Sequence, residues 1–519
     1  MKADAVVVGG GHNGLVAANQ LADAGWDVLV LESQSKPGGA VRSDRGVHPD
    51  FVHDTFSSFH PLAVVSPAMR AMRLEEHGLT WSHAPAVVGT PYLSGGWAVL
   101  HRDRERTARE LDADTPGDGH AWLRLCSMWD RVGDDLVDSL MSPFPPLRRG
   151  ARTLTRLPGH GGTTLLRAAL GSAQGLVRRE FRGVHAQMLL TGNAAHGDVA
   201  VGRPGSGIFG LLLAMTAQKH GFPAATGGAQ QLTDALVRRL ESRGGRIVCD
   251  ATVERVLVRD GRAHAVRTTG GDVVSARRAV LADVPAPALY GGLVAWDDLP
   301  ARTRGLMRWF RWDPGTVKVD WALSGPVPWA NRPTAAPGTL HLSETVAEVA
   351  RYQRELAAHA VPSRPYLLAG QMATTDPGRA PAHAESLWAY THVPQHTTSD
   401  AGGAGITGRW GHDDTERMAD RIQARFEEYA PGFGDRVLAR RVLGPRELQA
   451  RDGSLRNGAL NGGTGVLTQQ LVLRPVPGLG GARTPVRGLF LASSSAHPGG
   501  GVHGACGANA AHAAQRGRP

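Results

Sequence analysis

The chain has 519 residues, which is too long for one ordinary hydrophobic core, so we expect two or more domains. Its hydrophobic fraction of 42% is ordinary for a soluble globular protein, and no apolar run reaches the ~18 residues that a membrane span needs. The net charge of +10 rests on arginines that are not interleaved with aromatic residues as in nucleic-acid-binding motifs, so no nucleic-acid partner is expected.

A dinucleotide-binding pattern occupies the first thirty-two residues. Residues 6–8 form a short apolar run typical of a buried strand, and they lead into the spacing G-x-G-x-x-G over residues 9–14. Residues 15–24 then predict a helix, and residues 28–31 predict a second strand that ends at Glu32.

Each part of this motif has a physical task. Gly9 lets the chain turn sharply, Gly11 leaves room for a pyrophosphate beside the backbone, and Gly14 lets the helix pack close to the strand. The first N–H groups of the helix attract phosphate. Glu32 can accept hydrogen bonds from an adenosine ribose but would repel a 2′-phosphate, which favours FAD or NAD over NADP.

A second glycine pair follows in the segment Pro-Gly-Gly-Ala-Val-Arg-Ser at residues 37–43. It brings more bare backbone close to the ribose-binding strand. An NAD site does not need this contact, whereas many FAD proteins have it, so the pair favours FAD. A plain surface turn is the alternative interpretation.

Residues 60–225 lack the regular alternation of strands and helices. Apolar spacing predicts a helix over 122–140, and the run 207–217 predicts a buried helix or a channel wall. Residues 139–183 contain one acid, Glu180, against eight arginines. These arginines are Arg148, Arg149, Arg152, Arg156, Arg167, Arg178, Arg179 and Arg182. The segment is either a basic patch on a membrane surface or over an apolar tunnel, or a solvated loop and helix.

A further α/β unit begins at Gly227-Gly228. Asp260-Gly261-Arg262 is a strong turn signal between two strands, so it predicts a hairpin. The expected elements are a helix over 232–243, a strand over 246–249, the hairpin strands 252–258 and 263–268, a strand over 273–282, a strand of a different sheet over 316–323, and a helix over 414–429.

The C-terminal part repeats the opening pattern. Residues 488–492 predict a short buried strand, residues 497–504 form a glycine-rich turn, and residues 505–514 predict a small-residue helix. The N–H groups of such a turn are free and can stabilise negative charge, for example on a reduced flavin ring. Together with the first motif, this turn favours one long FAD site over two unrelated loops.

These stretches resemble the phytoene desaturase-related branch of FAD-dependent oxidoreductases, a group that includes carotenoid desaturases, retinol saturases and pyridine nucleotide-disulfide oxidoreductase domain-containing protein 2. The resemblance rests on residues 8–18, on Leu31-Glu32 with Gly38-Gly39-Ala40, and on the sequence from Gly227-Gly228 to 253–256. It continues through 473–478, 484–491 and 497–502. Related proteins with this second glycine motif have arginine where this chain has Ala40.

The resemblance implies an α/β fold, α+β overall, in which a discontinuous Rossmann-like FAD-binding domain carries an inserted substrate domain of mixed sheet and helices. The FAD-binding domain would comprise residues 1–60, 225–285 and 455–519, and the substrate-binding domain residues 61–224 and 286–454. The residues expected to hold FAD are Gly9, Gly11, His12, Asn13, Gly14, Glu32, Gly38, Gly39, Arg42, Ser43, Val253, Gly500, Gly501 and Val502.

The expected activity is that of an FAD-dependent oxidoreductase, of dehydrogenase or desaturase type, that oxidises an apolar or polycyclic small molecule. A flavin amine oxidase, a saturase or isomerase, and a flavin-binding protein without turnover are the alternatives. His503, His60 and Asp54 are the candidates for proton transfer. Oxygen, a quinone or another acceptor would take the electrons, and no metal site is expected.

The three cysteines, Cys126, Cys249 and Cys506, form no CxxC pair, which disfavours a disulfide reductase and indicates a reducing compartment. The first strand begins within a few residues of Met1, so no leader peptide is expected. We therefore expect a cytoplasmic protein, with a peripheral contact to the inner face of the membrane as an option. Abundant arginine, alanine and glycine suggest a GC-rich bacterial genome and a place in specialised metabolism.

Overall fold

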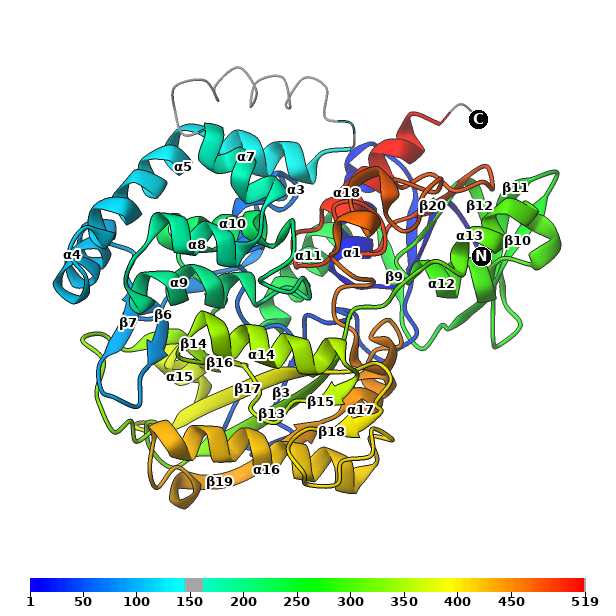
Figure 1. The fold of residues 1–519 in the computed structure, drawn as a ribbon. Helices are drawn as coiled ribbons and strands as arrows, with labels where there is room; N and C mark the ends of the chain where they lie inside the picture. The colour runs from blue at the N-terminus through cyan, green and yellow to red at the C-terminus, as the bar shows by residue number, and fades with distance from the viewer. Residues whose placement is uncertain (144, 146–161, 518–519) are drawn as a thin grey trace.

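Two seven-stranded sheets organise the chain in the computed structural model, which describes residues 1–143, 145 and 162–517 (Figure 1). One sheet lies near both ends of the chain, and the other lies beneath a layer of helices from the middle of the sequence. The expected α/β class with a Rossmann-like part is confirmed.

The first sheet is mainly parallel. Its strands are β1 (Lys2–Val8), β2 (Val28–Leu31), β9 (Arg246–Val248), β10 (Val253–Arg259), β11 (Arg262–Thr268), β12 (Val273–Ala282) and β20 (Leu489–Leu491). The order is β10-β11-β12-β1-β2-β9, and β20 adds to β12 in parallel. Strands from the start, the middle and the end of the sequence therefore form one sheet.

The two faces of β1 bury alternate residues. Ala5 and Val7 join the core beneath α1 (His12–Asp23), α11 (Gln230–Ser242) and α18 (Ala505–Gln515). The intervening residues of β1 join a second core on the opposite face. This double burial explains why a continuous apolar run, without polar alternation, forms the strand.

The hairpin predicted around residues 260–262 is confirmed. Strands β10 and β11 pair antiparallel, and Asp260 and Gly261 between them have φ values of 50° and 69°. Positive φ at both central positions fits the twist of a two-residue hairpin, and Asp-Gly is favoured there because it tolerates that conformation.

The second sheet is mostly antiparallel. Its strands are β6 (Ala86–Pro91), β7 (Trp97–Leu100), β13 (Gly315–Leu323), β14 (Pro337–Leu342), β16 (Leu367–Gln371), β17 (Glu385–Val393) and β19 (Val437–Leu443), in the order β19-β13-β17-β16-β14-β6-β7. Trp321 of β13 packs with Phe426 of α16 (His412–Tyr429) on one face. The strand expected over 316–323 and the helix expected over 414–429 are both confirmed.

Helices from the middle of the chain cover the other face of this sheet (Figure 1). They include α5 (Asp118–Met141), α7 (Gly162–Leu170), α8 (Ala173–Glu180), α9 (Val184–Ala194), α10 (Ser206–His220) and α14 (Val346–Ala357). Helix α10 contains the run 207–217, which is mostly buried as a helix should be. The helix predicted over 122–140 corresponds to α5.

Only part of the basic segment 139–183 lies among the residues that the structure describes. Its arginines Arg148, Arg149, Arg152 and Arg156 lie outside the described residues, whereas Arg167 is on α7 and Arg178 and Arg179 are on α8. Among the helices that the structure describes, none combines the length and the apolar character that crossing a bilayer requires.

A buried ion pair joins the parts of the chain that carry the two sheets. Arg379 lies shortly before β17, and its Nη1 donates to Asp54 Oδ2 over 2.8 Å. Asp54 belongs to the short strand β4 (His53–Asp54), which pairs with β3 (Ser43–Asp44). Both side chains of the pair have no exposed surface. Since water cannot screen such a pair, its partners depend strongly on each other.

Candidate functional site

The first glycine turn is tightly closed on the sheet. Gly9 has a φ of 97°, and its N–H donates to Leu31 O over 2.8 Å. The N–H of Gly10 donates to Glu32 Oε2 over 2.7 Å. A Cβ on Gly14 would lie 2.2 Å from Gly9 O, so the helix approaches the turn as closely as glycine permits. Glu32 and the glycines of the first turn, which were expected to hold the ADP part of FAD, therefore lie together.

The second glycine pair lies directly against the first turn. Gly38 donates its N–H to Gly10 O over 2.8 Å. Gly39 has a φ of 54°, and a Cβ there would lie 3.1 Å from the Cα of Gly11. Arg42 Nε in turn donates to Gly39 O over 2.9 Å. Two stretches of bare backbone therefore share one surface, which fits a pyrophosphate.

The C-terminal turn reaches the same place from the other end of the chain. Gly499 and Gly501 have φ values of 116° and 114°, and His12 Nε2 lies 3.2 Å from Gly501 O. Gly501 and Val502 keep part of their surface accessible, as do Gly11 and His12. Two glycine-rich turns almost 490 residues apart thus form one continuous backbone surface, and an extended two-part cofactor such as FAD fits it.

Three of the predicted site histidines gather around this junction. Burial lowers the pKa of His12 and of His60 to about 4, and that of His503 to about 3. A protonated His12 would lower the pKa of each of the other two, so the three rings lie near one another. His60 Nε2 also lies 3.2 Å from Ser57 Oγ. At neutral pH these imidazoles are uncharged hydrogen-bonding groups.

The remaining predicted residues have clear places. Ser43 Oγ donates to Asp54 Oδ1 over 2.7 Å, and the N–H of Ala229 donates to the same oxygen over 2.8 Å. Since Arg379 takes Oδ2, both oxygens of Asp54 are engaged within the protein, which favours a structural part for this carboxylate. Val253 is buried at the start of β10, two residues after Ala251, whose N–H donates to Glu32 O.

Asp283 is a site residue that the sequence reasoning did not assign. It follows β12, and its Oδ2 accepts a hydrogen bond of 2.8 Å from the N–H of Gly14. That oxygen also lies 2.7 Å from where a Cβ on Gly11 would be. Burial raises the pKa of Asp283 to about 7. The available signal was its position at the carboxyl end of a parallel strand next to β1, where such sheets bind ligands.

Asp283→Asn should remove a pH dependence from FAD binding. An ionised Asp283 would repel the pyrophosphate, so wild-type affinity for FAD should fall about tenfold between pH 6 and pH 8, as expected for uptake of one proton by a group with a pKa near 7. Asparagine can still accept from Gly14 but carries no charge. Titration of the apoprotein with FAD, followed by flavin fluorescence, measures both curves.

The same substitution gives a second readout, in stability. The folded-state pKa of Asp283 lies above the ordinary value of 3.8, so its contribution to stability is present at acid pH and is lost as the pH rises through about 7. The apoprotein of Asp283→Asn should therefore gain stability over wild type at pH 8 but not at pH 4. Parallel pH curves for the two proteins would contradict this role for Asp283.

Arg474 and Asp313 shape the segment that faces the C-terminal turn. The guanidinium of Arg474 is buried, and it donates to Asn461 O over 2.7 Å and to Ser494 O over 2.8 Å. Asp313 accepts the N–H groups of Leu460 and Asn461, and burial raises its pKa to about 6. A Cβ on the neighbouring Gly500 would lie 2.4 Å from Asn461 Oδ1. Arg474 and Asp313 therefore fix the backbone around Asn461, which packs against Gly500 of the C-terminal turn.

Cys506 packs as a small apolar residue beneath the same turn. Its Sγ lies 3.4 Å from Gly499 O, and the side chain has no exposed surface. Burial raises the pKa of the thiol to about 12. A thiol in this state is unreactive, so these contacts favour packing over redox chemistry for Cys506.

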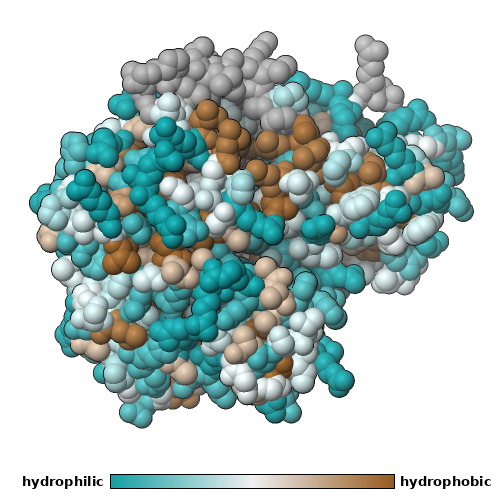
Figure 2. Space-filling model, viewed as in Figure 1, coloured by the Kyte–Doolittle hydropathy of each residue, from teal (hydrophilic) through white to brown (hydrophobic). Residues whose placement is uncertain are grey.

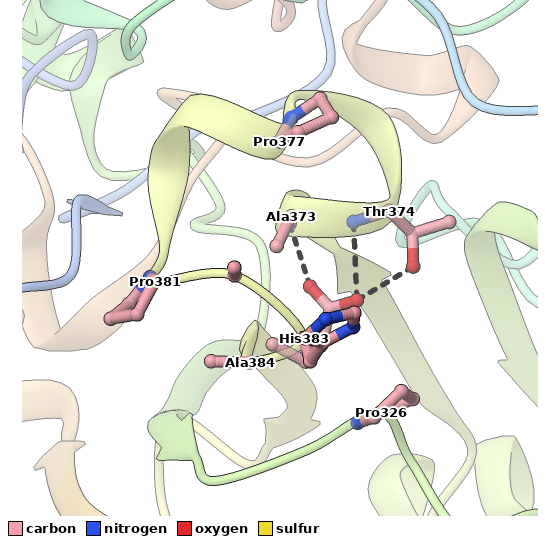
Figure 3. A pocket seen from close by; sticks show the side chains of 9 residues that line it. Pro326, Ala373, Thr374, Pro377, Pro381, His383 and Ala384 are labelled. Carbon is pink, nitrogen blue, oxygen red and sulfur yellow. Dashed lines mark hydrogen bonds between the residues drawn. The ribbon is translucent and has the colours of Figure 1, made fainter.

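A separate pocket of about 220 Å³ lies at the start of β17 (Figure 3). Glu385 forms part of its wall and accepts hydrogen bonds from the N–H groups of Ala373 and Thr374. Burial raises the pKa of Glu385 to about 7. The other lining residues are mostly proline and alanine, and none of the predicted site residues is among them.

Comparisons with known proteins identify a Rossmann-like segment and several relatives of the chain. Residues 7–72 match the NAD(P)-binding Rossmann-like domain. The chain is 28% identical to pyridine nucleotide-disulfide oxidoreductase domain-containing protein 2 of Mus musculus, over 98% of this chain and 92% of that protein. It is 28% identical to the hydroxyneurosporene desaturase of Cereibacter sphaeroides, over 56% of this chain and 57% of that protein.

Among solved structures, putrescine oxidase with bound putrescine has the same fold, with a TM-score of 0.59 at 16% identity over 99% of this chain and 98% of that one. The glycine turns, Glu32 and the sequence relatives together define an FAD-dependent oxidoreductase. Within that class, the chain is a relative of pyridine nucleotide-disulfide oxidoreductase domain-containing protein 2 and of the carotenoid desaturases, as its sequence indicates.

Proposed function

We propose that this oxidoreductase removes hydrogen from the carbon skeleton of an apolar or polycyclic small molecule. When bound, FAD supplies the hydride acceptor, and the protein orients the substrate and excludes water. The observation that carries the proposal is a run of apolar side chains, called here the apolar path, that joins the C-terminal glycine turn to the core above the second sheet. The names of the sequence relatives, which include a desaturase of a carotenoid, point to the same kind of substrate.

The apolar path begins at Leu62. A Cβ on Gly501 would lie 2.8 Å from Leu62 Cδ1, so this side chain borders the turn. Phe59, three residues earlier, has its ring centroid 6.2 Å from that of Trp388 on β17. The helices above this part of the sheet are apolar: α9 has no charged residue other than a histidine, and α10 has only Lys219 and His220 at its last turn.

We propose that His503 and His60 accept the proton that leaves when the substrate is oxidised, or pass it toward solvent. Both lie beside the junction of the two glycine turns, and both are uncharged at neutral pH because burial lowers their pKa values. The lowered pKa values make each imidazole a weak base, and the N–H of Ala505 already donates to His503 Nδ1. These histidines would therefore relay the proton toward solvent and not keep it. We further propose that oxygen, a quinone or another acceptor then takes the electrons, and that the protein acts in bacterial specialised metabolism.

Anaerobic reduction of the bound flavin tests the proposal. The FAD-loaded protein is mixed with carotenoid or terpenoid hydrocarbons and, separately, with primary amines and polyamines. We expect a hydrocarbon to bleach the flavin absorbance and the amines to leave it unchanged. Bleaching by amines alone would identify an amine oxidase instead. Readmission of oxygen or addition of a quinone then identifies the acceptor by the rate at which the oxidised spectrum returns.

A further inference from the structure

Seven large apolar side chains stand exposed on one face of the protein, with exposed fractions from 37 to 65%. They are Leu166, Leu170, Trp296, Trp309, Leu467, Leu471 and Val472, and we call them the apolar band. Figure 2 shows hydrophobic side chains gathered along the upper part of this face, from α7 across to α13 (Ala301–Met307). Monomeric proteins rarely expose so many large apolar residues together without a partner.

The band is continuous between α7 and the short helices η7 (Leu467–Gln469) and η8 (Leu471–Leu473). Gly171 ends α7, and its carbonyl accepts a hydrogen bond of 2.9 Å from the N–H of Gly205. A Cβ on Gly205 would lie 2.9 Å from Leu467 Cδ2. The leucines of α7 and those of η7 and η8 therefore belong to adjacent parts of one surface.

The band continues from η7 to α13. The N–H of Arg311 donates to Gln469 Oε1 over 3.0 Å, and Gln469 Nε2 donates back to Arg311 O over 2.9 Å. These two hydrogen bonds hold the segment that carries Trp309 against η7. Arg304 of α13 donates from Nη1 to Trp296 O over 3.0 Å, so Trp296 is held next to α13.

Arginines surround the band. Five exposed ones are Arg167, Arg203, Arg302, Arg308 and Arg311. Within the described residues, none of these five forms an ion pair. Two guanidinium groups lie over the exposed tryptophans, that of Arg304 at 5.4 Å from the Trp296 ring and that of Arg308 at 5.8 Å from the Trp309 ring. The exposed acids Asp297 and Asp298 beside Trp296 only partly offset this positive charge.

We propose that the apolar band docks on a bilayer surface that carries anionic lipid headgroups. Exposed leucines can enter the boundary of the acyl chains, tryptophan side chains prefer the interfacial depth, and arginines attract anionic headgroups. The arginines without acidic partners favour such a surface over a neutral one. This proposal concerns where the protein lies and stands independently of which substrate the flavin oxidises.

The band is also linked to the flavin side of the site. Arg474, directly after η8, donates to Gln469 O in η7 and to Ser494 O at the C-terminal turn. One buried guanidinium thus holds the docking surface and the turn together.

Co-sedimentation of the FAD-loaded full chain with vesicles tests the proposal. Vesicles of phosphatidylcholine alone are compared with vesicles that also contain phosphatidylglycerol. We expect binding to the anionic vesicles that weakens as salt is added, because salt screens exposed charges. The double variant Leu471→Asp with Val472→Asp should lower the partition coefficient about tenfold, and Arg308→Glu should lower it about fivefold.

Leu438→Asp is the matched control, because Leu438 is 55% exposed on β19, in the other half of the molecule. It should bind vesicles as wild type does, and flavin absorbance and circular dichroism should be unchanged in every variant. Failure of wild type to bind anionic vesicles at low salt would overturn the proposal. Self-association that the band variants abolish, without vesicle binding, would assign the band to a protein interface and overturn it equally.

Discussion

Gly14→Ala should leave the protein without bound FAD. A Cβ at this position would lie 2.2 Å from Gly9 O and 3.1 Å from Asp283 Oδ2, and both neighbours are held by hydrogen bonds to the sheet or the helix. Helix α1 would have to move away from β1, and its first N–H groups would move with it. These groups attract the pyrophosphate, so the loss should exceed a hundredfold in FAD affinity.

The measurement is the ratio of flavin absorbance to protein absorbance after purification, followed by titration of the apoprotein with FAD. Gly411→Ala is a suitable control, because Gly411 has an ordinary extended conformation and nothing lies within 4 Å of its missing Cβ. That variant should keep its FAD. If Gly14→Ala purified with a full complement of flavin, the first glycine turn would not be the cofactor site.

Arg379→Met should cost the protein about 3–5 kcal/mol of unfolding free energy, the cost typical of breaking a buried pair from one side. The guanidinium donates to Asp54, to Asp376 and to Ala225 O. Methionine fills much of the same volume but leaves the two buried carboxylates without the guanidinium that pairs with them. Chemical denaturation at neutral pH measures the loss.

The pH dependence of this loss provides a sharper test. Burial alone would raise the pKa of Asp54, but Arg379 and the hydrogen bonds to the carboxylate hold it below its ordinary value of 3.8. In wild type this group therefore stabilises the fold above about pH 4 and loses its effect as the pH falls. Without Arg379 the pKa should rise, so the stability of the variant should decrease as the pH increases toward neutrality.

A surface pair supplies the control for Arg379→Met. Arg277 donates to Asp4 over 2.7 Å, but its side chain is 41% exposed. Arg277→Met should change the unfolding free energy far less than Arg379→Met does, because water screens the exposed pair. Equal losses of unfolding free energy in the two variants would contradict the idea that burial makes the Arg379–Asp54 pair more important for stability than a surface pair.

The sequence predicted the first sheet well, for local reasons. Gly9, Glu32 and the hairpin at Asp260-Gly261 each depend on backbone geometry that only a few residue types permit, so their identity in the sequence is informative. The C-terminal turn could be found in the same way. These motifs also implied that the two ends of the chain meet, which the contact between His12 and Gly501 now describes in atoms.

The second sheet was largely missed. Strands β6 and β14 are buried along their whole length and contain both glycine and proline, so neither alternation nor propensity marked them. Site residues that act through distant contacts were missed for a related reason. Asp283 meets Gly14 and Arg379 meets Asp54 across hundreds of residues, and no local pattern encodes such a pairing.

The meeting of β1 with β12 and β20, and of α1 with α18, also has a consequence for biosynthesis. The ribosome makes β1 and α1 long before Gly501 and α18. Strand β1 can pair with β2 early, but the N-terminal half of the cofactor site lacks β12, β20 and the C-terminal turn until those segments have been synthesised. Capture of the flavin belongs to the end of translation, and a nascent chain stalled before residue 489 would lack β20 and everything after it.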